Sequence, residues 1–218
     1  MKRWREDPVL VRCAPFAAFI TLLVLASVLS ITGTAVVRNL IVLAILVWFW
    51  RSYGELRKAP PLAAPQWLLA VAVGLATFVL WIHLDQDWAM LSRPSGGFDP
   101  RREDGDVNWP FALLRLAGFA LVVPVMEELF WRSFLLRWIA RHDFLAVAPR
   151  EAGARAFLIT TVLFALEHNQ WLAGAIAGAG YNWLYMRSGN LRVAVLAHAV
   201  TNGALGAWIL YSGNWQFW

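Results

Sequence analysis

Long apolar stretches alternate with short polar ones along this chain, and seven of them are long enough to form buried helices. A helix that spans a membrane needs about 20 mostly apolar residues. The pattern therefore predicts an all-α fold, a polytopic transmembrane helix bundle of seven spans, or eight if 110–126 forms a separate re-entrant segment. The predicted segments are 14–31, 36–50, 67–84, 110–140, 154–168, 171–187 and 193–211.

Two of these segments need a further comment. The first follows a charged start and resembles a signal peptide, but its long apolar run predicts a retained anchor. The fourth, 110–140, exceeds the thickness of the hydrocarbon layer at 1.5 Å per residue. Because it contains Pro124, we expect a kink or break there.

Composition agrees with a membrane protein. Of the 218 residues 60% are hydrophobic and 15% are charged, against roughly 45–50% and 25% in soluble domains. The net charge of +5 does not predict nucleic-acid binding, because the basic residues are dispersed beside the apolar segments. Cys13 is the only cysteine, so an internal disulfide and a cysteine-based metal cluster are excluded.

Basic residues gather in four clusters between the apolar segments, and such clusters favour the cytoplasmic side. Seven spans from a cytoplasmic N-terminus place all four on one face and the polar loop 85–108 on the other. The clusters are Lys2, Arg3 and Arg5; Arg51, Arg57 and Lys58; Arg137, Arg141, Arg150 and Arg155; and Arg187 and Arg192.

Ionisable residues inside a membrane segment are costly and are candidates for function. In the fourth segment Glu127 and Glu128 are adjacent, and Arg132 follows four residues after Glu128. That spacing places Glu128 and Arg132 on one helical face as a pair, whereas Glu127 points about 100° away without this partner. Glu127 is therefore a candidate general base. The alternative is an ordinary salt bridge on a surface helix.

Two further polar clusters follow. Phe164 and His168 share one face of their helix, with Glu167 on another. Taken alone, a histidine in an apolar helix is more often a hydrogen-bonded core residue than a catalytic one. His198 and Asn202 are four residues apart and project together, so both can donate hydrogen bonds to one ligand oxygen. Polar contacts between membrane helices are the alternative for this pair.

Helix lengths indicate which residues can meet. Antiparallel packing across the 141–153 turn places Glu127 and His168 at the same depth. His198 lies closer to the cytoplasmic end, so tilt or a shorter sixth helix must bring it to them. Glycines of the sixth helix allow close packing against the fifth and seventh. They are Gly174, Gly178 and Gly180.

The three clusters, Glu-Glu-x-x-x-Arg, Phe-x-x-x-His and His-Ala-x-x-Asn, resemble in order the three motifs of the CAAX prenyl protease and bacteriocin-processing family (CPBP, Abi), relatives of the Ras-converting enzyme. The resemblance covers roughly 110–212. It divides the chain into N-terminal helices and a polar loop over 1–109, a catalytic helix core over 110–212 and a short tail over 213–218.

The resemblance implies an intramembrane endopeptidase (a hydrolase) that opens toward the cytoplasm and acts on a membrane-associated or lipidated protein or peptide. By that analogy Glu127 and His168 activate a water, and His198 and Asn202 stabilise the oxyanion, at about 3–4 kcal/mol per donor. Residues in supporting roles would be Glu128, Arg132 and Phe164.

The resemblance leaves the cofactor open, because the family has been described both as metal-dependent and as glutamate-type. Glu127, His168 and His198 could supply three ligands of a zinc site with an open position, which would make His198 a ligand rather than a donor. The sequence around Glu127 also resembles that of a bacterial subgroup associated with exosortase protein-sorting systems. This resemblance would place the chain in a bacterial cell membrane.

Two other functions compete with proteolysis. A non-catalytic membrane scaffold or immunity protein could retain the same fold, since fold does not guarantee activity. A proton-coupled transporter also uses Glu and His within the membrane, but it predicts repeated halves, and the sequence shows no internal repeat.

Overall fold

The computed structural model describes residues 6–29, 31, 33–92 and 97–218, and over these residues the chain is helical apart from one isolated bridge between Arg101 and Val107. Each of the seven predicted apolar segments is a helix. The α-helices are α1 Pro8–Val28, α2 Ala35–Trp48, α3 Gly54–Arg57, α4 Ala64–His83, α5 Trp109–Ala117, α6 Val123–Glu128, α7 Arg137–Ala140, α8 Gly153–Glu167, α9 Trp171–Ser188 and α10 Leu191–Ser212.

Helix α1 begins earlier than predicted, at Pro8. The side chain of Asp7 caps it by accepting hydrogen bonds from the backbone N–H groups of Val9 and Leu10, at 2.9 and 3.1 Å. Proline suits the first position because that N–H would lack a helical partner anyway. Because the helix begins at Pro8, it includes Arg12, which precedes the predicted start at residue 14.

Four helical stretches are long and apolar enough to cross a membrane: Pro8–Val28, Ala64–His83, Trp109–Ala140 and Leu191–Ser212. Helix α2 is apolar but shorter, with 14 residues, and α8 and α9 do not reach the same length and hydropathy. The all-α membrane fold is confirmed at this coarser level. The count of seven spans stays a prediction.

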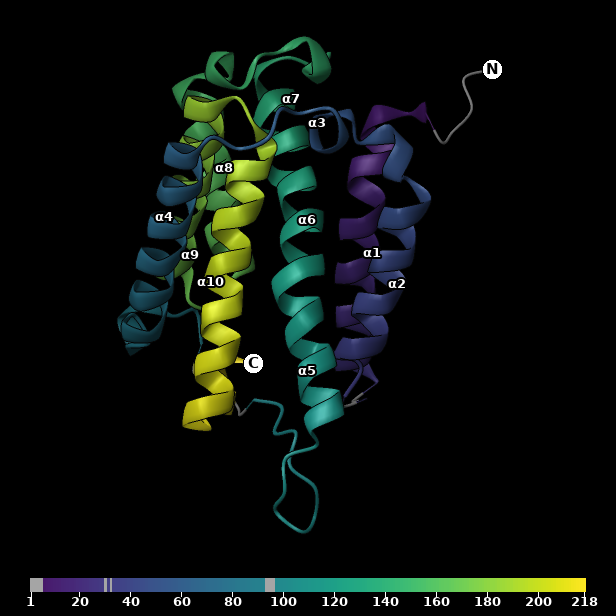
Figure 1. Ribbon diagram of the computed structural model, residues 1–218, viewed down its shortest axis with the longest axis vertical. Helices are drawn as coiled ribbons and strands as arrows, with labels where there is room; N and C mark the ends of the chain where they lie inside the picture. Colours follow the sequence, from purple (N-terminus) through teal and green to yellow (C-terminus); the bar gives the residue numbers. More distant parts are fainter. Residues whose placement is uncertain (1–5, 30, 32, 93–96) are drawn as a thin grey trace.

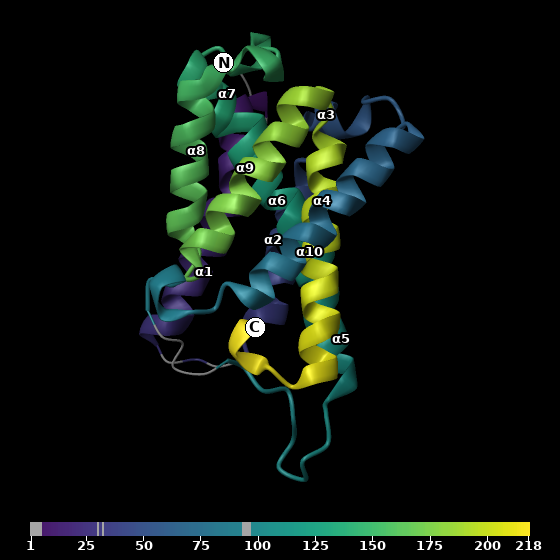
Figure 2. The same cartoon turned by 90° about the vertical axis from the view of Figure 1, so that its left-hand side faces the viewer.

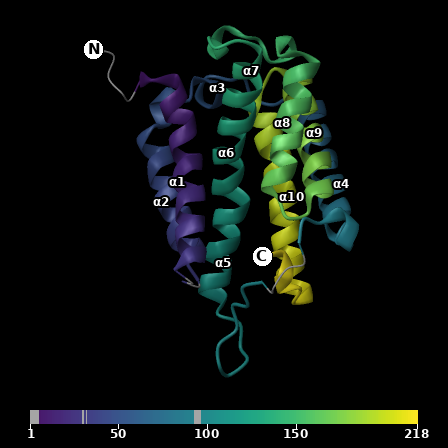
Figure 3. The same cartoon turned by 180° about the vertical axis from the view of Figure 1, so that it is seen from behind.

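A central rod formed by α5, α6 and α7 divides the bundle (Figure 1). Helices α1 and α2 lie on one side of the rod, and α4, α8, α9 and α10 lie on the other. The same division is visible from behind (Figure 3). Helix α9 crosses the bundle obliquely beside α8 and α10 (Figure 2). The sequence indicated that His198 reaches the depth of the other polar residues only if a helix is tilted or the sixth helix is shorter, and α9 is tilted.

The rod is one continuous helical stretch of 32 residues, so the break expected near Pro124 is absent. Two π-helical turns, η4 (Gly118–Val122) and η5 (Leu129–Leu136), flank α6 instead. Pro124 lacks an N–H and crowds the carbonyl one turn before it. A wider π-turn directly ahead of the proline accommodates both effects without ending the helix, and such turns often occur at functional sites.

The two ends of the bundle differ in charge. One end carries α3, α7 and the turns that join α7 to α8 and α9 to α10, and the polar loop before α5 lies at the other end (Figure 1). The described basic clusters therefore share one end, as the sequence predicts. Lys2, Arg3 and Arg5 lie outside the described residues. Arg137 is the exception within its cluster, because its side chain is buried rather than at the surface.

Close helix packing depends on glycine, although not with the partners expected. A Cβ on Gly178 would lie 3.2 Å from the Phe164 ring on α8, as predicted. Gly180 faces Val73 of α4 rather than α10. The closest approach to α10 comes from Gly74 of α4, whose carbonyl accepts a hydrogen bond from Thr201 at 2.9 Å.

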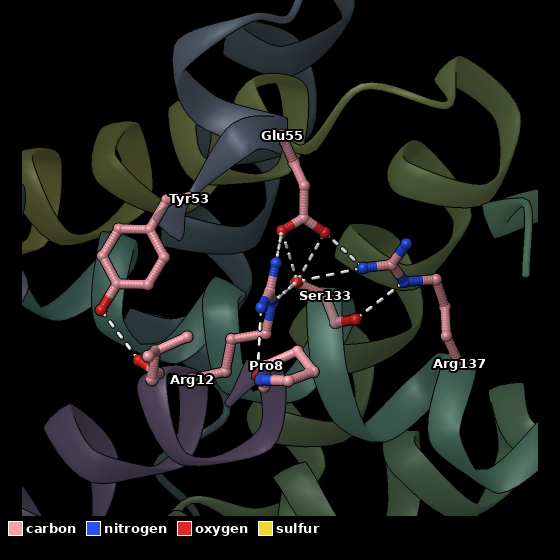
Figure 4. A network of polar contacts seen from close by, with 7 residues as sticks. Pro8, Arg12, Tyr53, Glu55, Ser133 and Arg137 are labelled. Carbon is pink, nitrogen blue, oxygen red and sulfur yellow. Dashed lines mark hydrogen bonds and ion pairs between the residues drawn. The ribbon is translucent and has the colours of Figure 1, made fainter. Parts of the chain in front are cut away.

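A buried ionic network joins α1, α3 and the end of the rod (Figure 4). The carboxylate of Glu55 accepts hydrogen bonds from Arg12, Arg137 and the Ser133 hydroxyl. Arg12 also donates to Ser133 at 2.6 Å, and Tyr53 donates to the carbonyl of Val11 at 2.8 Å. The network fixes α1 against the segment that follows the first sequence motif.

Burial alone would raise the pKa of Glu55, but the charges of Arg12 and Arg137 and the Ser133 hydroxyl outweigh it, so the pKa of Glu55 lies below its usual range. Removing this charge leaves two buried guanidinium groups without a counter-charge. We expect Glu55→Gln to destabilise the protein by about 3 kcal/mol, measured as a lower midpoint of thermal unfolding in detergent. Glu103→Gln, in the exposed 85–108 loop, is the control and should change nothing.

The sign of the pH effect follows from the lowered pKa. The Glu55 contribution is fully present above the unfolded value of about 4.3 and is lost as the pH falls through the lower folded value. The stability difference between wild type and Glu55→Gln should therefore stay constant at neutral pH and shrink only in strong acid. A difference that vanishes between pH 5 and 7 would contradict this assignment.

Candidate active site

The adjacent carboxylates of the first motif lie in different surroundings, as their spacing predicts. Both are on α6 and both are buried, with exposed fractions of 5% for Glu127 and 0% for Glu128. Oε2 is buried without a hydrogen-bond partner in both residues. Glu128 makes its polar contacts through Oε1, whereas the Glu127 carboxylate forms no ion pair with any of the described residues. A buried carboxylate without partners is costly, so Glu127 is the less satisfied of the two.

Glu128 holds three helical segments together. Its Oε1 accepts from Nη1 of Arg132 at 3.1 Å and contacts Nδ1 of His198, on α10, at 2.9 Å. The ion pair with Arg132 is the one that the i,i+4 spacing predicts. The contact with His198 was not predicted. It takes one ring nitrogen away from the oxyanion role that we assigned to that histidine.

Arg132 extends this cluster to a third and fourth helix. Its Nη2 donates to the carbonyl of Gly178 on α9 at 3.2 Å, and its guanidinium lies 4.5 Å from the centre of the Phe164 ring on α8. The side chain is 1% exposed. Such a guanidinium is stable only with both a counter-charge and hydrogen-bond acceptors. Nη1 and Nη2 of Arg132 have these, while its Nε is buried without a partner.

His168 directly follows α8 at its C-terminal cap. Its Nδ1 lies 2.8 Å from the carbonyl oxygen of Phe164. A carbonyl only accepts hydrogen bonds, so Nδ1 carries the proton, and Nε2 of the neutral ring is left as an acceptor. The Trp81 and Phe164 rings lie 5.3 and 4.6 Å from the imidazole, between ring centres, and fix its position.

His198 and Asn202 both face the interior from α10. The His198 ring stacks on Tyr181 at 5.0 Å between ring centres. Asn202 donates through Nδ2 to the carbonyl of Phe119, in π-helical η4, at 2.9 Å. The amide carries two N–H groups, so this bond orients Asn202 and leaves it a second donor.

Four of the residues singled out in the sequence line one small enclosed cavity: Glu127, His168, His198 and Asn202. Phe164 and Tyr181 form part of its wall. Its volume is about 60 Å³. Since one water occupies about 30 Å³, the cavity can hold about two waters but not a peptide.

Two larger cavities adjoin it. One of about 260 Å³ shares Glu127 and His168 with the small cavity, and one of about 670 Å³ shares His168. The largest is also lined by Asp85, Gln170 and Trp218. Asp85 follows α4, Gln170 precedes α9 and Trp218 is the last residue. These parts of the chain lie toward the end of the bundle opposite α3 and α7 (Figure 2), so the cavity lies away from the basic end.

Sequence reasoning underrated two residues near this site. Glu167 was placed on another face, but it lines the 260 Å³ cavity with Glu127 and His168, and it accepts a hydrogen bond from the Trp131 indole at 3.1 Å. Tyr181 drew no attention, because a tyrosine in an apolar helix has no distinguishing pattern. Its hydroxyl donates to Thr201 at 2.7 Å, one turn from His198.

The zinc alternative does not fit the side chains as they are placed. Within the described residues, no group of three or more His, Cys, Asp or Glu side chains is arranged to hold a metal ion. Glu127, His168 and His198 share a cavity wall, and the Nδ1 contacts of both histidines leave Nε2 available, but the three side chains as placed are not grouped to hold one ion. The mechanism below therefore uses the side chains alone.

Comparison with known proteins places these motifs in a family. Residues 109–204 match the family model of type II CAAX prenyl endopeptidase Rce1-like proteins. The matched segment runs from α5 into α10 and contains all three motifs, which confirms the family resemblance drawn from them. No curated protein and no solved structure matches the chain.

The two adjacent glutamates should respond oppositely to neutralisation. Glu128→Gln leaves Arg132 buried without its counter-charge and should cost about 3 kcal/mol, or about 6–12 °C in Tm. Glu127→Gln removes a buried charge whose Oε2 has no partner and should be neutral or stabilising. Thermal unfolding in detergent, followed by tryptophan fluorescence, measures both. Equal losses in the two variants would contradict the difference in surroundings.

Proposed function

We propose that this chain, a member of the Rce1-like CAAX endopeptidase family through residues 109–204, is an intramembrane endopeptidase. It hydrolyses a peptide bond of a membrane-associated or lipidated protein or peptide. The observation that carries this proposal is the shared cavity of Glu127, His168, His198 and Asn202. Three separate helical regions contribute a carboxylate, two imidazoles and an amide to a space that fits water.

The first step is the activation of a water molecule. A water in the small cavity donates one hydrogen bond to Glu127 and one to the acceptor Nε2 of His168. As the water oxygen attacks the peptide carbonyl carbon, its proton passes to the Glu127 carboxylate. A positioned general base contributes about 10²- to 10⁴-fold to such a step.

The second step stabilises the tetrahedral oxyanion. Asn202 is bonded to the Phe119 carbonyl through one amide hydrogen and can offer the other. His198 donates through Nδ1 to Glu128, so its Nε2 can donate only when the ring carries both protons. Glu128 provides the negative charge that balances the resulting imidazolium. This gives Glu128 and Arg132 a positioning role behind His198.

The third step releases the products. The proton held by Glu127 moves to the amide nitrogen of the substrate, the carbon–nitrogen bond breaks, and an amine and a carboxylic acid leave. Glu127 thereby returns to its carboxylate form, and each turnover consumes one water. The small cavity does not hold a peptide, so a peptide enters from the two larger cavities. The reaction therefore needs an opening movement.

Loss of individual site residues tests the chemistry. Glu127→Gln and His168→Ala should each lower kcat by about 10²- to 10⁴-fold, and Asn202→Ala by about 10²- to 10³-fold. The assay is cleavage of an internally quenched peptide library by purified protein in proteoliposomes. Exposed Arg150→Gln is the control and should retain wild-type rates.

The same assay separates proteolysis from a scaffold function on this fold. Full activity of Glu127→Gln would refute the mechanism. A wild-type protein that is folded and inserted, yet cleaves nothing in the library or in a membrane proteome, would favour the scaffold.

We further propose that the basic end lies in the cytoplasm of a bacterial cell membrane, because basic residues between spans favour that side. On this placement the 670 Å³ cavity opens toward the opposite, non-cytoplasmic side. That differs from the cytoplasmic opening that the family resemblance implies. The substrate would then be a segment exposed outside the cytoplasm, consistent with a role beside a protein-sorting system.

Cysteine labelling decides the orientation. In a Cys13→Ala background, Glu103→Cys in the polar loop should react with an impermeant maleimide in right-side-out vesicles. Arg150→Cys at the basic end should react only in inside-out vesicles. The reversed pattern would place the cavity opening in the cytoplasm and refute the orientation proposed here.

A further inference from the structure

Two arginines lie within apolar helices, one on the rod itself and one on α2 beside it. Arg38 is on α2, one turn after its start, and Arg115 is on α5. Both line the 260 Å³ cavity that also reaches Glu127 and His168. They are close enough for their charges to repel each other. Charges at such positions are costly and mark functional sites.

Arg38 and Arg115 are partly buried, and they differ from the three fully buried arginines in lacking an acidic partner. Arg12 and Arg137 bind Glu55, and Arg132 binds Glu128. No Asp or Glu among the described residues lies within ion-pairing distance of Arg38 or Arg115. Moreover, Nε of Arg38 is buried and has no hydrogen-bond partner. The cavity therefore presents two positive charges with unused donors.

Aromatic rings lie against both guanidinium groups. Arg38 lies 4.4 Å from the centre of the Phe19 ring, and Arg115 lies 5.0 Å from each of the Phe98 and Trp218 rings. A cation–π contact uses the flat face of a guanidinium. The N–H groups point outward in its plane, and these are the donors that bind a carboxylate in a two-pronged arrangement.

The direction of the two side chains favours a ligand within the bundle. An arginine that anchors a helix to lipid headgroups extends outward to the membrane surface. Here both side chains are only partly exposed and line the cavity that reaches Glu127, and the Phe19 ring of α1 lies against Arg38. An anion that entered this cavity would relieve the repulsion between them.

The separation of Arg115 and Glu127 indicates how far apart along a substrate the two contacts would lie. Arg115 and Glu127 are 12 positions apart along the rod, which corresponds to about 18 Å. An extended peptide covers about 3.3–3.6 Å per residue. Because both side chains line the same cavity, a substrate that reaches both sites places a carboxylate within about five residues of the bond that is cleaved.

We propose that Arg38 and Arg115 form a subsite for a carboxylate of the peptide substrate, either its C-terminus or an acidic side chain. The proposal rests on the proposed protease function and adds the substrate chemistry to it. Acidic groups near the cleaved bond are recognised in the cavity before the bond reaches Glu127. A substrate in which this carboxylate is neutralised loses the contact with both arginines.

The test compares matched substrates with matched variants. One quenched peptide library carries free C-terminal carboxylates and acidic side chains, and the other has both replaced by amides. We expect the wild type to cleave the acidic library about 10- to 100-fold better in kcat/KM, the range of a charge-assisted hydrogen bond. Arg38→Gln and Arg115→Gln should each lose most of this preference while cleaving the amide library at wild-type rates.

Arg187→Gln is the matched control, because Arg187 also lies over an aromatic ring, Trp183, but is exposed and lines none of the three cavities around Glu127. Equal losses on both libraries would overturn the subsite and make the two arginines structural. A loss that depends only on the fraction of anionic phospholipid in the vesicles would also overturn it, in favour of a headgroup contact.

A binding measurement keeps this inference separate from the protease proposal. Glu127→Gln retains Arg38 and Arg115, and it should bind acidic peptides about 10- to 100-fold more tightly than their amides. If the wild type cleaves neither library but this binding preference persists, the protease function fails and the subsite stands. If the acidic and amide peptides bind equally, the subsite fails whatever the activity.

Discussion

The arrangement of the site depends on one carboxylate that water cannot reach. Glu128 binds Arg132 one turn along its own helix and His198 on α10, and Arg132 in turn binds the backbone of α9. Breaking any of these contacts leaves a charge buried without compensation, which is far more costly than losing an exposed ion pair. The cluster therefore fixes the relative position of the rod, α9 and α10, and with it the distance between Glu127 and the groups opposite it.

Irregular helix geometry allows this cluster to coexist with an open cavity. The two π-helical turns lie directly before and after α6, so both glutamates are carried on a short regular helix between wider turns. The hairpin of α8 and α9 presents His168 at its tip, and the 85–92 segment binds that tip through Asn169. Glu127, His198 and Asn202 thus come from helices and His168 from the end of one, whereas the surroundings of the opening come from loops.

Most helices could be predicted from the sequence, because hydropathy is a local property. The Glu128–Arg132 pair could also be predicted, since helical spacing determines it. The contact between Glu128 and His198 could not be predicted, because the two residues are 70 positions apart. It also depends on the tilt of α9, which no local sequence pattern indicates. The sequence showed which residues are charged but not how deeply each is buried. Arg137 was assigned to a basic cluster beside a turn and Glu167 to a different helical face from His168, and tertiary packing buries Arg137 and places Glu167 in the wall of a cavity with Glu127.

The small volume between Glu127, His168, His198 and Asn202 also constrains what the protein can accept. A peptide in a helix has its backbone amides shielded by its own side chains and hydrogen bonds, and its width of about 10 Å is far greater than a space that fits two waters. Only an extended, locally unwound segment with slender side chains can present its carbonyl there. Recognition would then depend less on a particular sequence than on how readily a membrane-bound segment gives up its helical hydrogen bonds.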